Sequence, residues 1–309
     1  MTERLSLSVI IPAYKRGESL ARCLKALENQ VRLPDEVLVV KRDGDTEVEN
    51  ALTQFASSKL LIRTVYVFEP GQVQALNAGL AAISSNSQVV CMTDDDTAPH
   101  TDWIEKIERH FLEDAELGGV GGRDEQVNRK SVEPQLASGV GVITWYGKIM
   151  GGHHQGVGEK RFVDHLRGAN MSYRKEAISG LFFDTSLRGR GAQVYNDLAF
   201  SFAVRNAGWK LLYDPELKVD HFQEERFEKD MRGNFNYEAV VDGSFNRKKA
   251  VFKNLSFERK LSYLLYSLLI GDKFTPGLVQ TLRLLPLEGL NGLKRFFATL
   301  QGLMLFSRS

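Results

Sequence analysis

The sequence predicts an α/β protein with a mainly parallel central sheet, flanking helices and a helical C-terminal extension. Through the first 112 residues, short runs of β-branched and apolar residues alternate with segments in which apolar residues recur at helical spacing. These runs are almost continuously apolar, as expected for strands that are covered on both faces. In sheets of this kind the ligand site lies beyond the carboxyl ends of the strands. We therefore expect the chemistry of the protein in the residues that follow each strand.

The periodicity places the expected elements along the chain. Four strands are expected at residues 8–12, 36–40, 63–68 and 88–92, and three helical faces at residues 20–27, 73–83 and 104–111. A later helix is expected over residues 196–207, beginning with the capping pair Asn196-Asp197, followed by a strand over residues 210–213. The glycine-rich stretch between residues 118 and 195 is expected to form loops that shape the crevice, because glycine allows close approach of the backbone.

The composition excludes several classes of protein. The chain has 309 residues, of which 43% are hydrophobic and 26% charged, values that exclude a disordered or collagen-like chain. The net charge of +1 gives no argument for nucleic-acid binding. Cys23 and Cys91 are too few for a disulfide framework, so we expect both to be reduced and buried. The sequence shows neither a signal-peptide pattern nor an apolar stretch of spanning length, and we expect a cytoplasmic protein.

Acidic residues follow two of the predicted strands. Asp94, Asp95 and Asp96 come directly after the fourth strand. Carboxylates at positions i and i+2 can share a hard cation such as Mg²⁺ or Mn²⁺, which also prefers phosphate oxygens, although a solvated turn or a helix cap would use the same residues. Asp43 follows the second strand, either as an acceptor for a base or ribose group or as the turn residue that Asp-Gly favours. These residues are expected to converge at one rim with the segments 12–16 and 69–71.

An ordered set of motifs resembles family-2 glycosyltransferases with the GT-A, nucleotide-diphospho-sugar fold. The motifs are Val9-Ile10-Ile11-Pro12-Ala13-Tyr14, Asp43-Gly44, Ala75-Leu76-Asn77-Ala78-Gly79, Thr93-Asp94-Asp95-Asp96, Arg167-Gly168-Ala169-Asn170-Met171 and Asn196-Asp197-Leu198. The resemblance covers residues 6 to 222. It implies an inverting hexosyltransferase-type enzyme that moves one sugar from a nucleotide-diphospho-sugar, most often a UDP-sugar, to a hydroxyl acceptor.

The resemblance also implies roles for individual residues. The donor-binding set would be Pro12, Ala13, Tyr14, Asp43, Gln74, Asn77, Asp94, Asp95 and Asp96. Asp94 and Asp96 match the family's DXD pattern, which binds Mn²⁺ or Mg²⁺ against the diphosphate, and His221 would complete the metal shell. Asp197 matches the acid that usually serves as general base. The family commonly has Glu-Asp at this point where this chain has Asn196-Asp197, and both residues could instead cap the helix.

The acceptor side is expected to involve Trp145, Gly168, Ala169 and Asn170. Trp145 would either stack on a sugar or pack in the core. The Gln-x-x-Arg-Trp pattern of processive family members is missing, which favours transfer of a single sugar. Two alternatives remain open, a nucleotidyltransferase of similar fold and a non-catalytic nucleotide-sugar-binding module. A Rossmann dehydrogenase is excluded because no Gly-x-Gly-x-x-Gly follows the first strand.

Charge divides the chain into two parts. Residues 1–225, the expected catalytic domain, carry 26 basic and 32 acidic groups, with a donor half at 1–117 and an acceptor half at 118–225. Residues 226–309 carry 14 basic and 7 acidic groups on a leucine-rich background. Amphipathic helices of this kind can lie on an anionic membrane, which would suit a lipid-linked saccharide acceptor and a peripheral location on the inner face of the membrane. The alternative is a helical extension packed on the catalytic domain or on a second copy.

Overall fold

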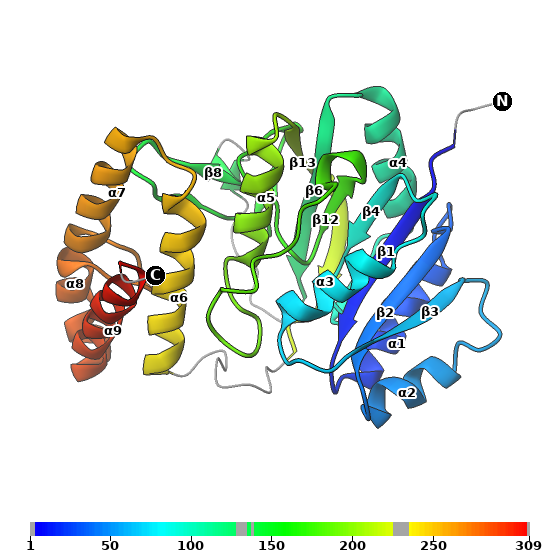
Figure 1. The fold of residues 1–309 in the computed structure, drawn as a ribbon, viewed down its shortest axis with the longest axis horizontal. Coiled ribbons are helices and arrows are strands. Elements are labelled where there is room, and N and C mark those ends of the chain that lie inside the picture. Colours follow the sequence, from blue (N-terminus) through cyan, green and yellow to red (C-terminus); the bar gives the residue numbers. More distant parts are fainter. Residues whose placement is uncertain (1–3, 128–134, 137–138, 225–234, 308–309) are drawn as a thin grey trace.

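One large sheet, covered by helices on both faces, forms the body of the protein, and a further group of helices packs at the end of the molecule opposite β3 (Figure 1). The structure is a computed structural model that describes residues 4–127, 135–136, 139–224 and 235–307. The first half of the sheet has the parallel order β4-β1-β2-β3. Its strands are β1 (Leu7–Ala13), β2 (Glu36–Arg42), β3 (Ile62–Val67) and β4 (Val89–Met92).

The helices that connect these strands cover the two faces in a regular way. They are α1 (Gly17–Glu28), α2 (Thr46–Thr53), α3 (Gln72–Ala82) and α4 (Trp103–Glu113). One core cluster joins α1, α2 and α4 to the sheet and includes Val9 and Val39, whereas their neighbours Ile10 and Val40 face α3 in a second cluster. The predicted strands and helices of this region are confirmed, with small differences at their ends. Helix α2 was not predicted, because its buried face consists of only two residues.

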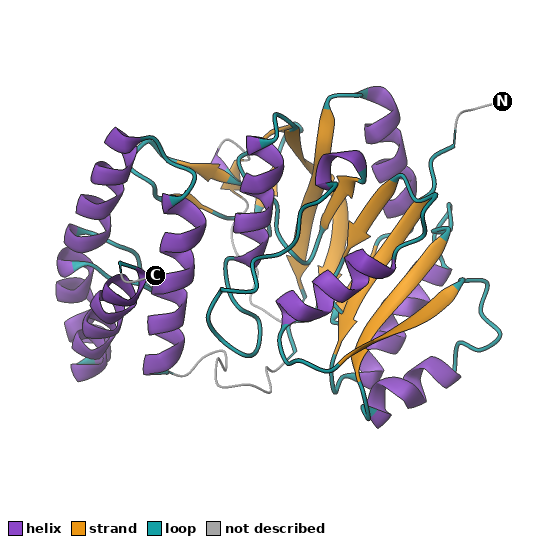
Figure 2. Ribbon diagram, viewed as in Figure 1, coloured by secondary structure: helices purple, strands orange, loops and turns teal. Residues whose placement is uncertain are grey.

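The second half of the sheet is mixed (Figure 2). Its strands are β5 (Thr97–Pro99), β6 (Leu117–Gln126), β11 (Arg161–Phe162), β12 (Met171–Arg174) and β13 (Lys210–His221). Among the strands described in this sheet, β5, β11 and β12 run against the common direction of the others. The prediction of a mainly parallel sheet is therefore confirmed. Both cysteines are free and buried, as predicted.

The glycines at 118–122 were expected in a loop, and that expectation is wrong because they lie in β6. Glycine is required there by crowding from the neighbouring elements rather than by a turn. A Cβ at Gly118 would lie 2.3 Å from the Cβ of Trp209, and one at Gly119 would lie 2.8 Å from side-chain atoms of Leu211 and Tyr173. The later glycines Gly151 and Gly152 do lie in a loop, at the edge of a pocket.

A bulge in β13 sets the position of its last residues. The register between β13 and β6 shifts between Asp214 and Lys218, and at this point a Cβ on Gly122 would lie 1.8 Å from the carbonyl oxygen of Leu217. Bulges of this kind bend a strand and redirect the side chains beyond it. Beyond the bulge, β13 pairs with β5 and sets His221 opposite Thr97. A histidine far along the chain is thereby placed beside the residues that follow β4.

Shorter elements lie between the sheet and the C-terminal helices. They are the strands β7 (Gln135–Leu136), β8 (Val142–Ile143), β9 (Ile149–Met150) and β10 (Gly156–Val157), the 3₁₀ turn η2 (Glu176–Ile178) and helix α5 (Asn196–Asn206). Strands β8 and β9 form a hairpin whose loop holds Trp145. Trp145 is 65% exposed, so the alternative that it packs in the core is wrong.

The predicted helical extension is present as α6 (Tyr237–Phe252), α7 (Phe257–Leu269), α8 (Leu278–Glu288) and α9 (Leu290–Phe306). Helix α6 lies between α5 and the outer helices (Figure 1) and is buried along much of its length. No helix in the described parts of the chain is both long and apolar enough to cross a bilayer. The proposed boundary at residues 225 and 226 falls outside the described residues.

We predict that Gly122→Ala destabilises the fold, because the new Cβ would collide with the Leu217 carbonyl at the β13 bulge. Overpacking of this kind costs about 1–3 kcal/mol of unfolding free energy. Urea unfolding followed by circular dichroism measures the loss. Gly151→Ala is the matched control, since nothing lies within 4 Å of its added Cβ. Equal unfolding midpoints for the two variants would contradict the described packing of β13 on β6.

Candidate functional site

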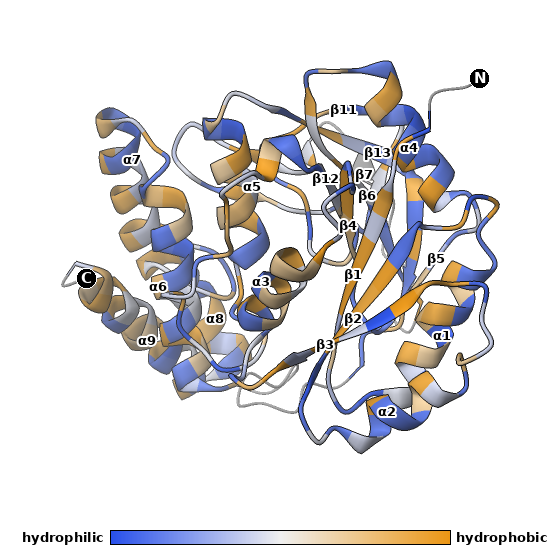
Figure 3. Cartoon of the chain, turned by 45° about the vertical axis from the view of Figure 1, so that its right-hand side comes forward, coloured by the Kyte–Doolittle hydropathy of each residue, from blue (hydrophilic) through white to orange (hydrophobic). Residues whose placement is uncertain are grey.

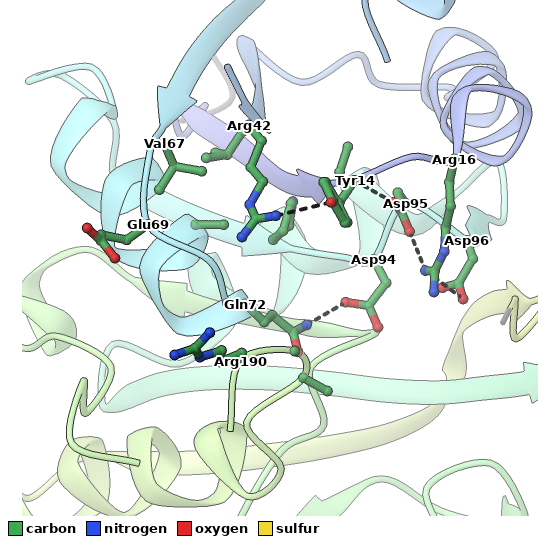
Figure 4. Close-up of a pocket in the computed structure, with 17 residues that line it drawn as sticks. Tyr14, Arg16, Arg42, Val67, Glu69, Gln72, Asp94, Asp95, Asp96 and Arg190 are labelled. Carbon is green, nitrogen blue, oxygen red and sulfur yellow. Dashed lines mark hydrogen bonds and ion pairs between the residues drawn. The ribbon is translucent and has the colours of Figure 1, made fainter. Parts of the chain in front are cut away.

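A pocket opens at the carboxyl edge of the parallel strands (Figure 4). Its lining comes from the last residues of β1 and β2 and from the segments that follow β1, β3 and β4. The lining residues include Pro12, Ala13, Tyr14, Arg16, Arg42, Glu69, Gln72, Asp94, Asp95 and Asp96. The segment 190–192, which precedes α5, closes another side of it. The predicted convergence of the strand ends at one rim is therefore confirmed.

Asp95 ties the loop after β1 to the end of β4. Its carboxylate accepts hydrogen bonds from the Tyr14 amide at 3.3 Å and from Arg16 Nη1 at 2.9 Å. The side chain is almost fully buried, and burial raises the pKa of Asp95 to about 7 even though the Arg16 guanidinium acts in the opposite direction. Arg16 also lies 3.4 Å from Asp96 Oδ2 and so supplies positive charge to two of the three aspartates.

Asp94, Asp96 and His221 form a cluster whose ligand atoms all lie within 4.8 Å of one another. His221 Nε2 is 3.3 Å from Asp96 Oδ1, and His221 Nδ1 is 3.4 Å from Oδ2 of the buried Asp124. Burial alone would lower the pKa of His221, but Asp124 and Asp96 outweigh it and raise the pKa to about 9. Burial likewise opposes the charge on Asp96, yet His221 and Arg16 hold the pKa of that carboxyl below its usual value.

The donor atoms of this cluster fit a divalent cation. Two carboxylates and an imidazole are a ligand set that Mn²⁺ accepts readily. Within the described residues, His221 Nε2 is buried without an aligned hydrogen-bond partner, and so is Asp124 Oδ1. Buried polar atoms are nearly always paired, so unpaired ones beside two acids indicate room for a ligand. Asp124 was not predicted as a site residue, because it lies in the glycine-rich segment in which the sequence predicts loops.

Asp43 does not line the pocket, and Arg42 does. Strand β2 continues two residues further than predicted, to Arg42, and Asp43 lies exposed in the turn that follows. The Arg42 guanidinium lies 4.7 Å from the centre of the Tyr14 ring and donates to Tyr14 Oη at 3.1 Å. Figure 4 shows both side chains directed toward the pocket. The guanidinium and the ring form a cationic part of the pocket wall.

On α3, Gln72 and Ala75 line the pocket, and Gln74 does not. Gln72 Nε2 donates to Asp94 Oδ1 at 3.1 Å and so fixes one of the metal-ligand candidates. Gln74 is half-buried and lies outside the pocket lining. The amide of Asn77 is paired with the backbone of Phe183, accepting from N at 2.8 Å and donating to O at 2.9 Å. Asn77 therefore has a structural role in fixing the segment that passes over α3.

Asp197 lies in a second pocket. The segment before α5 joins the two, since Ala192 lines the first pocket and Val194 lines the second. Asp197 Oδ2 accepts from the Gly168 amide at 3.2 Å and its Oδ1 from the Leu198 amide at 2.8 Å. The prediction that Asn196-Asp197 caps α5 is wrong, because the capping residue is Tyr195, at φ +73°. Asp197 is a first-turn residue instead.

Two buried histidines line the same pocket as Asp197. The rings of His153 and His165 lie 5.0 Å apart. Burial lowers the pKa of His165, and burial together with the neighbouring His165 lowers the pKa of His153 to about 3. Both imidazoles are therefore neutral near pH 7. His165 Nε2 has no hydrogen-bond partner among the described residues. No sequence pattern predicts this pair, because the two histidines come together from separate loops.

The predicted acceptor residues lie in different environments. Gly168 borders the second pocket through its hydrogen bond to Asp197. Ala169 is buried, and its carbonyl accepts from Thr93 Oγ1 at 2.8 Å. The buried Asn170 accepts from Trp103 Nε1 at 2.9 Å and donates to the Leu217 carbonyl at 2.8 Å, which ties β12 to the β13 bulge. Trp145 is exposed and outside the lining of the second pocket.

Sequence comparison relates the chain to known glycosyltransferases. The family model described as Glycosyl transferase family 2 matches residues 8–182. The probable glycosyltransferase YdaM of Bacillus subtilis is 28% identical over 224 residues, which are 70% of this chain and 50% of YdaM. Glycosyltransferase AglE of Haloferax volcanii is 31% identical over 106 residues, 32% of this chain and 33% of AglE. The chain thus spans half or less of the length of these curated relatives.

Solved structures share the fold. TarS 1–349 of S. aureus in complex with UDP-GlcNAc matches with a TM-score of 0.63 at 14% identity, covering 96% of this chain and 81% of that one. GalNAc-T7 with UDP, GalNAc and Mn²⁺ matches with a TM-score of 0.66 at 15% identity, covering 86% of this chain and 51% of that one. These likenesses show that the chain has the GT-A fold.

We predict that affinity for Mn²⁺ rises with pH between about 6.5 and 9. A histidine must lose its proton to bind a metal, and the acids around His221 raise its pKa from 6.5 to about 9, so the proton competes with the ion throughout this range. Titration calorimetry at several pH values measures the slope. His221→Asn has no such proton and should bind weakly with little dependence on pH. An unchanged slope in His221→Asn would remove His221 from the metal shell.

Proposed function

The chain belongs to glycosyl transferase family 2, and from this premise we propose that it transfers one sugar from a nucleotide-diphospho-sugar to a hydroxyl group of a saccharide acceptor. The observation that carries the proposal is the pair of pockets joined by the segment before α5. One pocket holds a cluster of acids suited to a cation and a diphosphate, and the other holds a carboxylate suited to a base. A transfer reaction needs both a donor site and an acceptor site.

The first pocket is proposed to bind the donor, a UDP-sugar. Pro12, Ala13 and Tyr14 would frame the base, and the Arg42 guanidinium would donate to its carbonyl groups. TarS, whose fold is similar, is described with UDP-GlcNAc, which supports a uridine nucleotide. A mannosyltransferase from Pyrobaculum calidifontis, described with GDP-Man and Mn²⁺, is also similar in fold, so the choice of base rests on the side chains of this pocket.

Asp94, Asp96 and His221 are proposed to hold the divalent ion, Mn²⁺ or Mg²⁺. When bound, such an ion neutralises the charge that develops on a departing diphosphate. Gln72 holds Asp94 in place, and Asp124 orients His221 through its other ring nitrogen. Partners of this second layer usually raise metal affinity by fixing the ligand rings. Arg16 adds a fixed positive charge beside the same acids.

Asp197 is proposed to act as the general base. The proton of the acceptor hydroxyl passes to the Asp197 carboxylate while the acceptor oxygen bonds to the anomeric carbon. The bond from that carbon to the diphosphate oxygen breaks at the same time, and its electron pair leaves with the diphosphate. A single displacement of this kind inverts the anomeric configuration. The choice of Asp197 as the base is supported by the lining of the second pocket, in which Asp197 is the one acid among the described residues.

The two histidines beside Asp197 suit an acceptor hydroxyl, and the cation of the same lining, Arg167, is paired with Asp124. His153 and His165 are neutral because of their burial, so neither forms an ion pair with the base. His165 Nε2 offers a buried hydrogen-bonding nitrogen to an acceptor hydroxyl. Gly168 donates its amide to Asp197 and keeps one oxygen of the carboxylate oriented. An oriented base needs less reorganisation during proton transfer.

We predict that Asp197→Asn lowers kcat by about 10²- to 10⁴-fold and leaves donor binding unchanged, since it removes the base but not the first pocket. Transfer is measured with a radiolabelled sugar, and donor binding by calorimetry. Asp102→Asn is the matched control, because Asp102 is an acid at the start of another helix, outside both pockets. Undiminished turnover in Asp197→Asn would refute the base assignment. NMR of the product must show the inverted anomer.

A second prediction separates two neighbouring side chains. Arg42→Ala should weaken donor binding by about tenfold, because a stacked, hydrogen-bonded guanidinium is lost from the pocket. Asp43→Ala should leave donor binding nearly unchanged, because Asp43 is exposed and outside the pocket lining. Calorimetric titration of both variants with UDP in the presence of Mn²⁺ gives the two affinities. The reverse ranking would restore Asp43 as the residue that contacts the base.

A further inference from the structure

The outward surface of helices α7, α8 and α9 exposes an unusual amount of apolar side chain. We call this surface the outer helical face. Leu265 on α7 is 51% exposed, Leu282 on α8 is 59% exposed, and Leu290 on α9 is 74% exposed. Scattered exposed apolar residues are normal, but a contiguous group of them usually marks a site of interaction. Figure 3 shows apolar segments along α8 and α9, and Figure 1 shows that these helices lie at the end of the molecule opposite β3.

These leucines are not the core-facing side of their helices. On α7, Leu261, Leu265 and Leu268 follow one another at helical spacing on the exposed side, while Tyr263 and Tyr266 are buried on the other side. On α8, Leu284 is buried and Leu282 and Leu287 are exposed. On both helices, buried residues pack against the protein, and the exposed leucines lie outside that packing. These exposed leucines contribute little to the fold.

Basic residues are interspersed with these leucines. Residues 253–307 contain seven Lys or Arg and three Asp or Glu. Two of the three acids are already paired within the protein, Asp272 with Arg247 and Glu288 with Arg295. Arg283 and Lys294 are exposed, and neither forms an ion pair within the described parts of the chain. The outer helical face is therefore apolar and positively charged at once.

We propose that the outer helical face docks on the surface of an anionic lipid bilayer. Leucines would enter the boundary between head groups and acyl chains, and the Lys and Arg side chains would meet lipid phosphates. A second copy of the chain fits less well, because a two-fold pairing would bring the same positive charges together. Lys is also depleted at protein interfaces. Since no described helix can cross a bilayer, the helices would lie on it.

The connection between α7 and α8 links the outer helical face to the pocket that holds Asp197. This connection contributes Phe274 to the lining of the pocket. Two other residues of the connection, Ile270 and Lys273, are exposed. A chain docked by α7 and α8 would hold this pocket close to the lipid head groups. Together with the proposed function, on which this step rests, the placement of the pocket indicates the class of acceptor. The acceptor would be a saccharide carried on a membrane lipid.

Sedimentation of the full chain with vesicles tests the proposal. The chain should sediment with phosphatidylcholine vesicles that contain about 30 mol% phosphatidylglycerol and bind phosphatidylcholine vesicles much more weakly. Leu265→Glu with Leu282→Glu should reduce binding to the anionic vesicles by about tenfold or more, and so should Arg283→Glu with Lys294→Glu. Leu61→Glu is the matched control, because Leu61 is equally exposed but lies beside β3, at the opposite end of the molecule. It should bind as the unchanged chain does.

Three results would overturn the proposal. They are failure to bind anionic vesicles, equal binding by both double variants and the unchanged chain, and a dimer in light scattering that Leu265→Glu with Leu282→Glu converts to monomer. Circular dichroism checks that each variant is folded. If the double leucine variant does not fold, Arg283→Glu with Lys294→Glu still tests the proposal. Asp197→Asn should bind vesicles normally, so a failure of the sugar-transfer proposal is distinguishable from a failure of docking.

Discussion

The repulsion among three consecutive aspartates at the end of β4 is the constraint on which the rest of the structure depends. Asp94, Asp95 and Asp96 cannot stand together in a partly buried pocket without nearby positive charge. The protein supplies it from two directions, with Arg16 from the loop after β1 and His221 from the end of β13. Both countercharges must arrive at one place, so the first half of the sheet, the β13 bulge and the short strand β5 are coupled through this cluster.

The three aspartates of this cluster make different contacts and therefore have different roles. All three line the pocket, but Asp95 accepts a hydrogen bond from the backbone of the β1 loop, whereas Asp94 and Asp96 form the cluster with His221. Without a metal ion, Arg16 offsets part of the negative charge of these acids. A divalent ion would offset more of that charge when bound. Asn170 joins β12 to the β13 bulge and so supports His221 from a distance. The acids are thus held in place by residues from three separate regions of the chain.

The C-terminal helices add a second constraint of a different kind. Helix α6 covers α5 and so stabilises the segment that joins the two pockets. Among the outer helices, α9 packs on α6 and α8 packs on α9, while leucines of α7, α8 and α9 stay exposed, which a folded domain alone does not require. The division of charge seen in the sequence acquires a physical meaning here. The acidic body contains the two pockets, and the basic end contains the surface that we assign to lipid.

The sequence by itself determined the alternating strands and helices of the first 112 residues, the free buried cysteines, the helical C-terminal extension and the acidic rim after β4. These features follow from local periodicity and from residue types that act over a few positions. Tertiary structure alone decided that glycines 118–122 form a strand, because crowding from Trp209 and Leu217 is invisible in the sequence. It also decided that Arg42 and Gln72 line the pocket instead of Asp43 and Gln74, since a shift of one or two residues at the end of an element changes which side chain points inward. The pairing of His153 with His165, likewise, depends on two loops that meet only in the folded chain.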